Sequence, residues 1–306
     1  MKFSIIIPTY NRAHLIGKAI QSVQQQTYTD WELLIVDDGS TDNTKEAVLS
    51  FLKDQRIHYI YQQNAERSAA RNNGIKNATG NYICFLDSDD YYLPQRLELL
   101  HQSISHHADS RFFYTGICFE KNGLVSKSPI EAYSGGNVFD FLVGNVIGIP
   151  QVCMHRSLFQ RELFNPAISN GEDVELWLRI ANYELPKYLE DQFTIVALDH
   201  NDRSVSIKNN GAAHSLKTLL YIFAPDKFGG KISPGIQQAR ISGCYVQIAY
   251  HHIFFKRRLK AIQYLLKAIF ADSSSVQTKF RVNILAQLCL YFSWQRIFQL
   301  TEISAD

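Results

Sequence analysis

The sequence predicts an α/β fold with a mainly parallel central sheet, followed by a helical subdomain at the C-terminus. The first observation behind this prediction is that short apolar runs alternate with segments of helical apolar spacing through the front of the chain. Such β-α-β alternation is typical of parallel sheets that carry helices on both faces. The second observation is that the chain becomes helical throughout after the polar loop 199–213.

The front of the chain contains four strand-like runs, each short, apolar and rich in residues that favour strands. We expect them at residues 3–8, 31–40, 56–61 and 81–86. The intervening segments have helical spacing or begin with residues that cap helices. These helices are expected at residues 11–26, 41–52 and 66–78.

The pattern is looser from about residue 111 to residue 155, where glycine-rich segments interrupt it. A helix with an acidic start follows at 171–181 and a strand at 193–198. The later helices are expected at residues 243–255, 256–271 and 279–298.

The domain boundary is expected within 215–235, where Gly229-Gly230 and Ser233-Pro234-Gly235 are typical of a linker. We therefore divide the chain into a domain over residues 1–220 and a helical, basic region over residues 221–306. Within the first domain, the pattern changes near residue 110, so that residues 1–110 and 111–220 form two halves.

Composition favours a globular protein of a reducing compartment. The 306 residues are 46% hydrophobic and 20% charged, a balance that can bury a large core. The five cysteines are scattered without CxxC pairs, which argues against a disulfide framework or a zinc site. The apolar run after Lys2 is too short for a signal peptide, and no segment has the length of a spanning helix. We expect a cytoplasmic protein.

Polar residues follow three of the predicted strands at their carboxyl ends. They are Thr9-Tyr10-Asn11, Asp37-Asp38-Gly39-Ser40 and Asp87-Ser88-Asp89-Asp90. In parallel sheets these ends lie at one edge, where ligands bind. The sequence therefore predicts one site at that edge.

Asp87, Asp89 and Asp90 crowd three carboxylates into four residues, and burying any of them unpaired would be costly. One interpretation is a solvated turn in which Asp90 or Ser88 caps a helix that starts near Pro94. The other is a divalent metal site, because hard cations prefer carboxylate oxygens and relieve the repulsion between them.

Two further segments allow both a structural and a functional interpretation. In "VDDGSTDNT" the later residues fit helix capping, which leaves Asp37 and Asp38 unexplained at the strand end. In "GEDVELWLR" the acidic turn can simply complement the helix dipole. His200 in "LDHNDRSVS" is either structural or a ligand of metal or diphosphate.

The order and spacing of "IIIPTYNR", "VDDGSTD" and "ARNNGIKNATGNYICFLDSDD" resemble the family-2 glycosyltransferases, which have the GT-A fold. The resemblance is strong over residues 3–95 and continues more weakly through "NGEDVELWLR", so that it covers about two thirds of the chain. It implies inverting sugar transfer from a nucleotide-sugar with Mn²⁺ or Mg²⁺, with uridine as the default base, as in bacterial surface polysaccharide assembly.

The resemblance also implies that residues 1–110 bind the nucleotide and residues 111–220 the acceptor. It further implies roles for single residues. The nucleotide-sugar would contact Pro8, Thr9, Tyr10, Arg12, Asp38, Arg71, Asp87 and Ser88. The metal ligands would be Asp89 and Asp87 of a DxD motif, and we add His200 as a further candidate. The base that deprotonates the acceptor hydroxyl would be Asp173, with Glu172 as second choice. The helix dipole lowers the pKa of such a base and burial raises it, a balance that the sequence leaves open.

Charge is distributed unevenly along the chain. Residues 1–226 carry 20 lysines and arginines against 26 acidic residues, a net charge of −6, whereas residues 227–300 carry 11 against one, a net charge of +10. In the helix over 256–271 the basic face is expected to carry Lys256, Lys260 and Lys267. The opposite, apolar face is expected to carry Leu259, Ile262, Leu266 and Ile269.

This basic region predicts contact with an anionic surface. Tyr291, Trp294 and Phe298 add side chains that favour membrane interfaces, so we expect peripheral binding to the inner face of the plasma membrane. Packing of these helices on the rest of the chain is the alternative. A nucleic-acid partner is not expected, because no motif of that kind accompanies the charge.

The prediction is thus a metal-dependent inverting glycosyltransferase acting on a glycan or lipid-linked glycan. Two other functions stay open. A nucleotidyltransferase could use the same aspartates and metal, although no glycine-rich phosphate loop supports it. A non-catalytic scaffold of a polysaccharide assembly complex could keep the fold without turnover.

Overall fold

A computed structural model describes residues 1–197 and 211–272, apart from residues 122, 129 and 146. The chain forms two compact units, Met1–Asn201 and Asp202–Asp306. This division lies about twenty residues before the boundary predicted at 220. The difference arises because the helix α7 (Gly211–Ile222) packs on α8 (Pro234–Phe254) and so belongs to the second unit.

The first unit alternates strands and helices through its front part, as the periodicity predicts. Its elements are β1 (Phe3–Thr9), α1 (Ile16–Gln24), β2 (Trp31–Asp37), α2 (Thr44–Leu49), η1 (Ser50–Lys53), β3 (Ile57–Tyr61), α3 (Glu66–Asn77), β4 (Tyr82–Phe85), β5 (Tyr91–Tyr92) and α4 (Arg96–Ser105). The remaining elements are β6 (Phe112–Lys121), β7 (Leu124–Ser128), α5 (Val138–Gly144), η2 (Ile149–Gln151), β8 (Val152–His155), η3 (Arg156–Gln160), α6 (Glu172–Ile180) and β9 (Pro186–Ala197).

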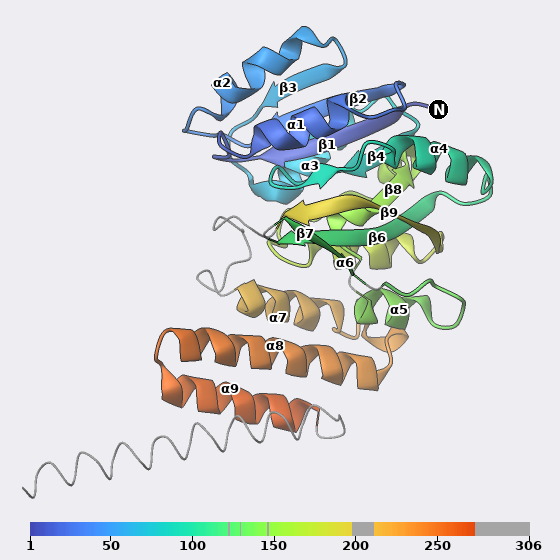
Figure 1. The fold of residues 1–306 in the computed structure, drawn as a ribbon. Coiled ribbons are helices and arrows are strands. Elements are labelled where there is room, and N and C mark those ends of the chain that lie inside the picture. Colours follow the sequence, from blue (N-terminus) through green and yellow to red (C-terminus); the bar gives the residue numbers. More distant parts are fainter. Residues whose placement is uncertain (122, 129, 146, 198–210, 273–306) are drawn as a thin grey trace, which may run out of the picture. The chain divides into compact units, whose positions relative to one another are not determined.

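The strands form one sheet of order β3-β2-β1-β4-β8-β6-β9-β5, with β7 paired to β6 (Figure 1). The first four strands are parallel, and Ile5 of β1 lies between Leu33 of β2 and Cys84 of β4. Their carboxyl ends therefore share one edge, where the site was predicted. The expected α/β fold with a mainly parallel sheet is confirmed for this half.

The sheet becomes mixed beyond β4. The strand β8 runs antiparallel to β4 and to β6, whereas β6 and β9 are parallel with a register shift near Gly116. The strand predicted at 193–198 begins at Pro186, because its first half pairs with β6 although it does not read as an apolar run. The loose pattern of 111–155 thus contains three strands.

Helices bury their apolar sides on both faces of this sheet. One face is covered by α1, α2 and α4, whose buried residues pack with Phe3, Ile5 and Ile7 of β1. On the other face α3 approaches so closely that Gly74 leaves no room for a side chain next to Ile6. These contacts place the starts of α1 and α3 beside the carboxyl ends of the strands.

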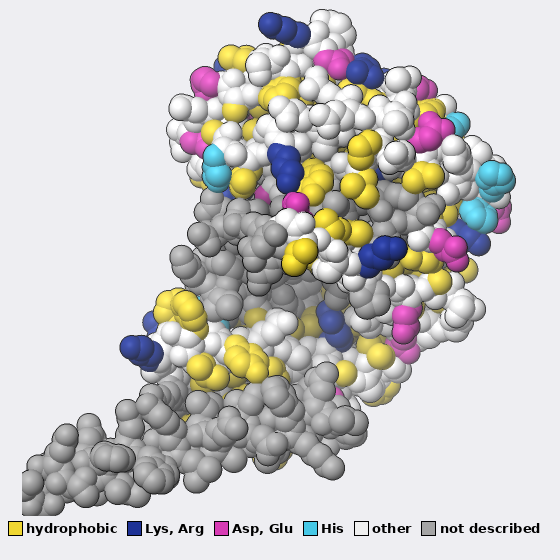
Figure 2. Space-filling model, viewed as in Figure 1, with side chains coloured by type: hydrophobic (Ala, Val, Ile, Leu, Met, Phe, Trp, Pro, Cys, Tyr) yellow, Lys and Arg dark blue, Asp and Glu magenta, His cyan; other side chains and the backbone are white. Residues whose placement is uncertain are grey.

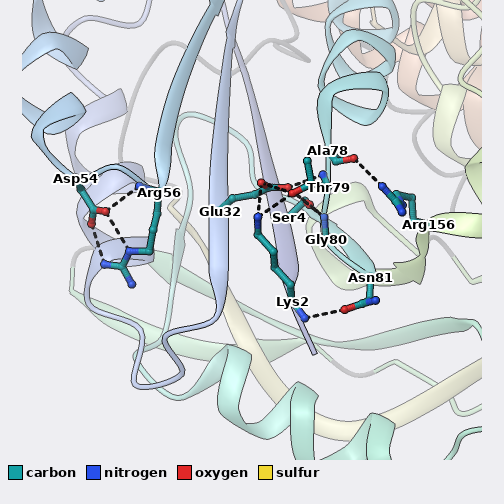
Figure 3. A network of polar contacts seen from close by, with 10 residues as sticks. All are labelled: Lys2, Ser4, Glu32, Asp54, Arg56, Ala78, Thr79, Gly80, Asn81 and Arg156. Atoms are coloured by element: carbon teal, nitrogen blue, oxygen red, sulfur yellow. Dashed lines mark hydrogen bonds and ion pairs between the residues drawn. The ribbon is translucent and has the colours of Figure 1, made fainter.

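The opposite, amino edge of the sheet holds a buried carboxylate. Glu32 accepts hydrogen bonds from Lys2 Nζ at 2.7 Å, Ser4 Oγ at 2.6 Å and Thr79 N at 2.6 Å (Figure 3). Burial would raise the pKa of Glu32, but these donors outweigh it and lower the pKa to about 2. The cluster joins β1, β2 and the turn before β4.

The second unit contains α7, the short turn η5 (Gly229–Lys231), α8 and α9 (Arg258–Ala271). Among the described residues, no helix combines the length and the apolar character that crossing a membrane requires. The third helix predicted at 279–298, with Tyr291, Trp294 and Phe298, lies outside the described residues.

The predicted apolar face of the helix over 256–271 is wrong in part. α9 buries Ala261, Leu265 and Ala268, whereas Leu259 is 76% and Leu266 40% exposed. α9 packs on α8, and small residues at 261 and 268 permit close approach of the two helices. The predicted lysines at 256, 260 and 267 are exposed.

Candidate functional site

Asp37 ends β2 and is fully engaged by its own chain. One carboxylate oxygen, Oδ1, accepts the backbone N–H of Ser40 at 2.8 Å, and the other, Oδ2, accepts the Tyr59 hydroxyl at 2.5 Å. Burial and the bond to Asp37 together raise the pKa of Tyr59 well above its usual value. Asp37 is 1% exposed and both of its oxygens bond within the chain, so it stabilises the turn.

Asp38 follows directly and is engaged on one side only. Its Oδ1 accepts the Gln62 side-chain amide at 2.7 Å and the backbone N–H of Ala65 at 2.9 Å. Its Oδ2 receives no bond from the residues that the structure describes. Of the two adjacent aspartates, Asp38 is therefore the one with an oxygen available, and its contact with the nucleotide stays a prediction.

The loop after β1 is held next to this turn. Asn11 adopts a left-handed backbone conformation with φ of 52°, and its side-chain oxygen accepts the N–H of Thr41 at 2.8 Å. The N–H of Arg12 donates to Thr44 Oγ1 at 2.9 Å. These bonds tie the predicted nucleotide residues at the end of β1 to the start of α2.

The predicted base-contacting residues of this loop differ in exposure. Tyr10 is 46% exposed, which leaves its ring accessible. Thr9 is buried, and its hydroxyl has no partner within the described part of the chain. A buried hydroxyl without a partner is costly, so the end of β1 has a polar group to offer to a ligand. The roles of Pro8, Thr9 and Tyr10 stay predictions.

The acidic turn after β4 does not cap the following helix. The N–H of Asp90 bonds to the carbonyl of Asp87, which closes a tight turn, and Asp90 itself is buried. The helix near Pro94 begins at Arg96, and its N-cap residue Gln95 makes no side-chain cap bond. The capping interpretation of Asp90 and Ser88 is therefore wrong, because the turn and β5 intervene.

Arg71 on α3 joins two parts of the site that are far apart in the sequence. Its Nη1 donates to Glu172 Oε1 at 2.8 Å and its Nη2 to Asp87 Oδ1 at 3.2 Å. The guanidinium is buried, while the Asp87 side chain is 36% exposed. Arg67, one turn earlier, lies 3.9 Å from Glu172 through its Nε. The predicted nucleotide residue Arg71 is thus neutralised by two carboxylates of the protein.

The acidic first turn of α6 contains three carboxylates with different partners. Glu172 is buried against Arg71, and Glu175 accepts two hydrogen bonds from Arg179. Asp173 Oδ1 accepts the N–H of Val174, but its side chain stays partly exposed. Since no cationic group bonds to Asp173 directly among the described residues, it is the carboxylate of this turn that remains accessible.

The pKa of Asp173 is raised to about 7. Desolvation is the largest cause, and the neighbouring charge of Glu172 adds to it, while the Val174 N–H and Arg71 act in the opposite direction. The balance that the sequence left open between burial and helix dipole is therefore resolved in favour of burial. A carboxylate with such a pKa can exchange protons near neutral pH.

The turn after β4 offers carboxylate oxygens, the kind of ligand that a divalent ion prefers. No group of three metal-binding side chains exists among the described residues. Arg71 bonds to Oδ1 of Asp87, and Oδ2 accepts no hydrogen bond from the described residues. Asp89 is partly exposed on the same turn. Mg²⁺ and Mn²⁺ sites commonly use one or two carboxylates and complete their shell with phosphates. The residues fit such a site, and His200 lies outside the described residues.

Sequence reasoning missed Tyr59 and Gln62, which hold the two aspartates after β2. Both belong to β3 or to the residue that follows it, at the same edge of the sheet. The rule that ligand-binding groups follow the carboxyl ends of strands applies to β3 as well, and it would have pointed to residues 61–65.

Comparison with known families identifies this arrangement. Residues 4–165 match the family described as Glycosyl transferase family 2. An uncharacterized glycosyltransferase of Rickettsia felis is 37% identical over 220 residues, which are 68% of this chain and 36% of that protein. The chain therefore spans only about a third of the length of this relative.

A second relative is covered more completely. The UDP-Glc:alpha-D-GlcNAc-diphosphoundecaprenol beta-1,3-glucosyltransferase WfgD of Escherichia coli is 36% identical over 181 residues, which are 58% of this chain and 68% of that protein.

Two solved structures share the fold. Staphylococcus aureus TarS 1-349 in complex with UDP-GlcNAc has a TM-score of 0.60 and 20% identity, with 89% of this chain and 81% of that chain covered. The mannosyltransferase PcManGT of Pyrobaculum calidifontis, in complex with GDP-Man and Mn²⁺, has a TM-score of 0.59 and 19% identity over 96% and 82%. The predicted GT-A fold is confirmed.

Proposed function

The chain belongs to Glycosyl transferase family 2, and on this premise we propose that it is a metal-dependent, inverting glycosyltransferase. The donor is a UDP-sugar and the acceptor a glycan or lipid-linked glycan. The name of the Escherichia coli relative, which includes UDP-Glc and a diphosphoundecaprenol acceptor, supports both assignments. The structural relative that was solved with UDP-GlcNAc supports the donor class.

The observation that carries the proposal is the bridge made by Arg71. Arg71 bonds both to Asp87, in the turn after β4, and to Glu172, in the acidic first turn of α6. The turn after β4 offers carboxylates to a metal and diphosphate, so the bridge holds that turn next to the acidic turn. Donor chemistry and acceptor chemistry need to meet at one point, because the acceptor oxygen attacks the sugar carbon that leaves the diphosphate.

Asp173 is the proposed base of this reaction. Its raised pKa and partial exposure suit proton removal from an acceptor hydroxyl. The hydroxyl oxygen then forms the new bond to the anomeric carbon from the side opposite the diphosphate, and the old carbon–oxygen bond breaks with its electrons on the diphosphate. The stereochemistry inverts because this is a single displacement.

The other residues position the donor. Asp38 offers its Oδ2 to the nucleobase of the donor, and Tyr10 offers an accessible ring at the end of β1. Asp87 and Asp89 would hold Mn²⁺ or Mg²⁺ together with the diphosphate, and the ion would offset the charge that develops on the leaving group. Arg71 fixes Asp87 in the orientation that this role requires.

The test is calorimetric titration of UDP into the wild-type protein with Mn²⁺ and then with EDTA, repeated with Asp89→Asn. We expect micromolar binding with Mn²⁺ that weakens at least tenfold in EDTA or in the variant. Asp109→Asn, a change at an exposed position, serves as the matched control and should bind as wild type does. Absence of UDP, GDP and dTDP binding by the wild type would overturn the donor assignment and favour a scaffold.

We further propose that the second unit binds anionic membrane from the cytoplasmic side. Apolar and basic side chains lie together where α8 meets α9, with Phe254 61%, Phe255 40% and Leu259 76% exposed beside the exposed Lys256 (Figure 2). Exposed phenylalanine and lysine side chains in one turn suit the interface of an anionic bilayer. A lipid-linked acceptor would be reached from such a surface.

A further inference from the structure

Gln62 connects the ends of two strands through both its backbone and its side chain. Its N–H donates to the carbonyl of Asp37 at 2.9 Å, and its side-chain Nε2 donates to Asp38 Oδ1 at 2.7 Å. It is the first residue after β3, so it reaches β2 across the carboxyl edge of the sheet.

The orientation of the Gln62 amide is determined by its neighbours. Asn73 on α3 donates its Nδ2 to Gln62 Oε1 at 2.8 Å, and Asn77 donates to Asn73 Oδ1 at 3.0 Å. A carboxylate can only accept hydrogen bonds, so the NH₂ group of Gln62 has to face Asp38 and its oxygen has to face Asn73. The side-chain amides of Asn77, Asn73 and Gln62 therefore form a series of hydrogen bonds that extends from α3 to the Asp38 carboxylate.

This chain of bonds leaves one oxygen of Asp38 for a ligand. Gln62 and the N–H of Ala65 both use Oδ1, and together they prevent the carboxylate from rotating. Asp38 is 4% exposed, so water contributes little to its solvation. A fixed, poorly hydrated oxygen that can only accept will attract a ring N–H and repel a ring nitrogen with a lone pair.

We propose that Gln62, oriented by Asn73, is a positioning residue that sets the base specificity of the nucleotide site. The inference rests on the proposed function, in which Asp38 faces the base. Uracil presents N3–H, a donor, to an acceptor oxygen, whereas cytosine presents N3 as an acceptor in the same place. The site should therefore select UDP over CDP, and the selection should depend on Gln62.

The experiment measures the dissociation constants of UDP and CDP, each with Mn²⁺, for wild type, Gln62→Leu and Asn73→Asp. In Asn73→Asp the new carboxylate attracts the NH₂ of Gln62, so that the amide turns its oxygen toward Asp38 without loss of buried volume. Gln63→Leu is the matched control, because Gln63 is the exposed neighbour on the same loop.

We expect wild type and Gln63→Leu to prefer UDP over CDP by about a hundredfold or more. Gln62→Leu and Asn73→Asp should lose about tenfold in UDP affinity with little change in CDP affinity, which lowers the UDP-to-CDP preference by a similar factor. Thermal unfolding of each variant shows whether it is folded, and the preference is compared among folded variants.

Each other outcome overturns the proposal. Equal weakening of UDP and CDP would mean that Gln62 supports the fold of the site without setting its specificity. An unchanged preference in both variants would mean that Asp38 needs no positioning. Absence of binding of either nucleotide by the wild type would instead overturn the proposed function, and with it the inference that rests on it.

Discussion

Asp37 and Asp38 are neighbours with the same side chain, yet the structure gives them opposite tasks. Both oxygens of Asp37 are taken by Ser40 and Tyr59, whereas Asp38 is bonded on one oxygen only. The difference follows from position, because Asp37 is the last residue of β2 and Asp38 is the first residue of the turn. A pair of identical residues at a strand end thus divides into one that builds the turn and one that can bind a ligand.

Asp173 gives the sharpest prediction at the scale of a single residue. Its pKa is raised to about 7, and a base acts in its deprotonated form, so sugar transfer should fall tenfold per pH unit as the pH drops below about 7. Asp173→Asn should bind UDP as wild type does and lose transfer by at least a thousandfold. Transfer is measured as UDP release with a donor sugar and acceptor over pH 5 to 9.

The same raised pKa has a consequence for stability, with a definite sign. The folded state holds the proton of Asp173 more tightly than the unfolded state, so stability falls as the pH rises from about 4 to about 7. Asp173→Asn should therefore stabilise the protein by about 1–3 kcal/mol at pH 8, less than the full shift implies because the side chain is partly exposed, and little at pH 4. A variant that is less stable at pH 8 would contradict the raised pKa.

At the scale of elements, the front of the sheet could be predicted from the sequence and the back could not. β1 to β4 are short apolar runs, and periodicity located them. β8 and the first half of β9 pair with β6 at separations of about 38 to 74 residues, and they carry no comparable apolar run. The strands β6, β7 and β8 within residues 111–155 were therefore not predicted.

The candidate site divides in the same way. The aspartates at strand ends were predicted because carboxylates there are unusual. Gln62 was missed because a glutamine in a loop is ordinary, and its function depends on which oxygen it contacts. The buried bridge from Arg71 to Glu172 was also missed, since the two residues lie 101 positions apart.

The Glu32 cluster yields a prediction about how elements are held together. Glu32→Gln should destabilise the protein by about 2–4 kcal/mol at pH 7, because the amide cannot satisfy Lys2, Ser4 and Thr79 together. The folded pKa of about 2 lies below the unfolded value near 4.5, so the contribution of Glu32 is present above pH 4.5 and is lost as the pH falls through about 2. Urea unfolding of both proteins at several pH values measures it.

The matched control for this experiment is Glu46→Gln on α2, where the carboxylate is exposed. It should change the free energy of unfolding by less than about 0.5 kcal/mol. If the difference between wild type and Glu32→Gln stayed constant from pH 7 down to pH 2, the low pKa of Glu32 would be wrong.

At the scale of the whole molecule, charge separates along the chain, with −6 over residues 1–226 and +10 over residues 227–300. The exposed face of α9 combines its lysines with Leu259 and Phe270, the latter 83% exposed. α9 packs on α8 and buries Ala261, Leu265 and Ala268. Among the described residues, this contact therefore does not explain the exposed apolar and basic face of α9.

We predict that the protein of residues 1–306 binds vesicles containing anionic phosphatidylglycerol in low salt and does not bind vesicles of phosphatidylcholine alone. Charge reversal of the lysines at 256, 260 and 267 should weaken binding about a hundredfold, since each basic side chain contributes about 1 kcal/mol. Vesicle co-sedimentation measures this effect.

The control variant reverses the exposed lysines at 45, 53 and 76 of the first unit, which changes the net charge by the same amount. It should bind vesicles nearly as wild type does. Equal loss of binding in both variants would show that net charge alone matters, and equal binding to neutral vesicles would contradict an electrostatic contact.

The bridge made by Arg71 also limits how such proteins can exchange parts. A chimera that takes residues 1–110 from this chain and the remaining residues from a relative would separate Arg71 from Glu172. It would also separate the free cysteines Cys84 and Cys153, which are opposite each other on β4 and β8. A partner half without a carboxylate at position 172 would leave a buried positive charge half-compensated, at a cost of several kcal/mol. New acceptor specificities are therefore more easily reached by recombination that keeps this acid, or by change within the loops, than by free shuffling of halves.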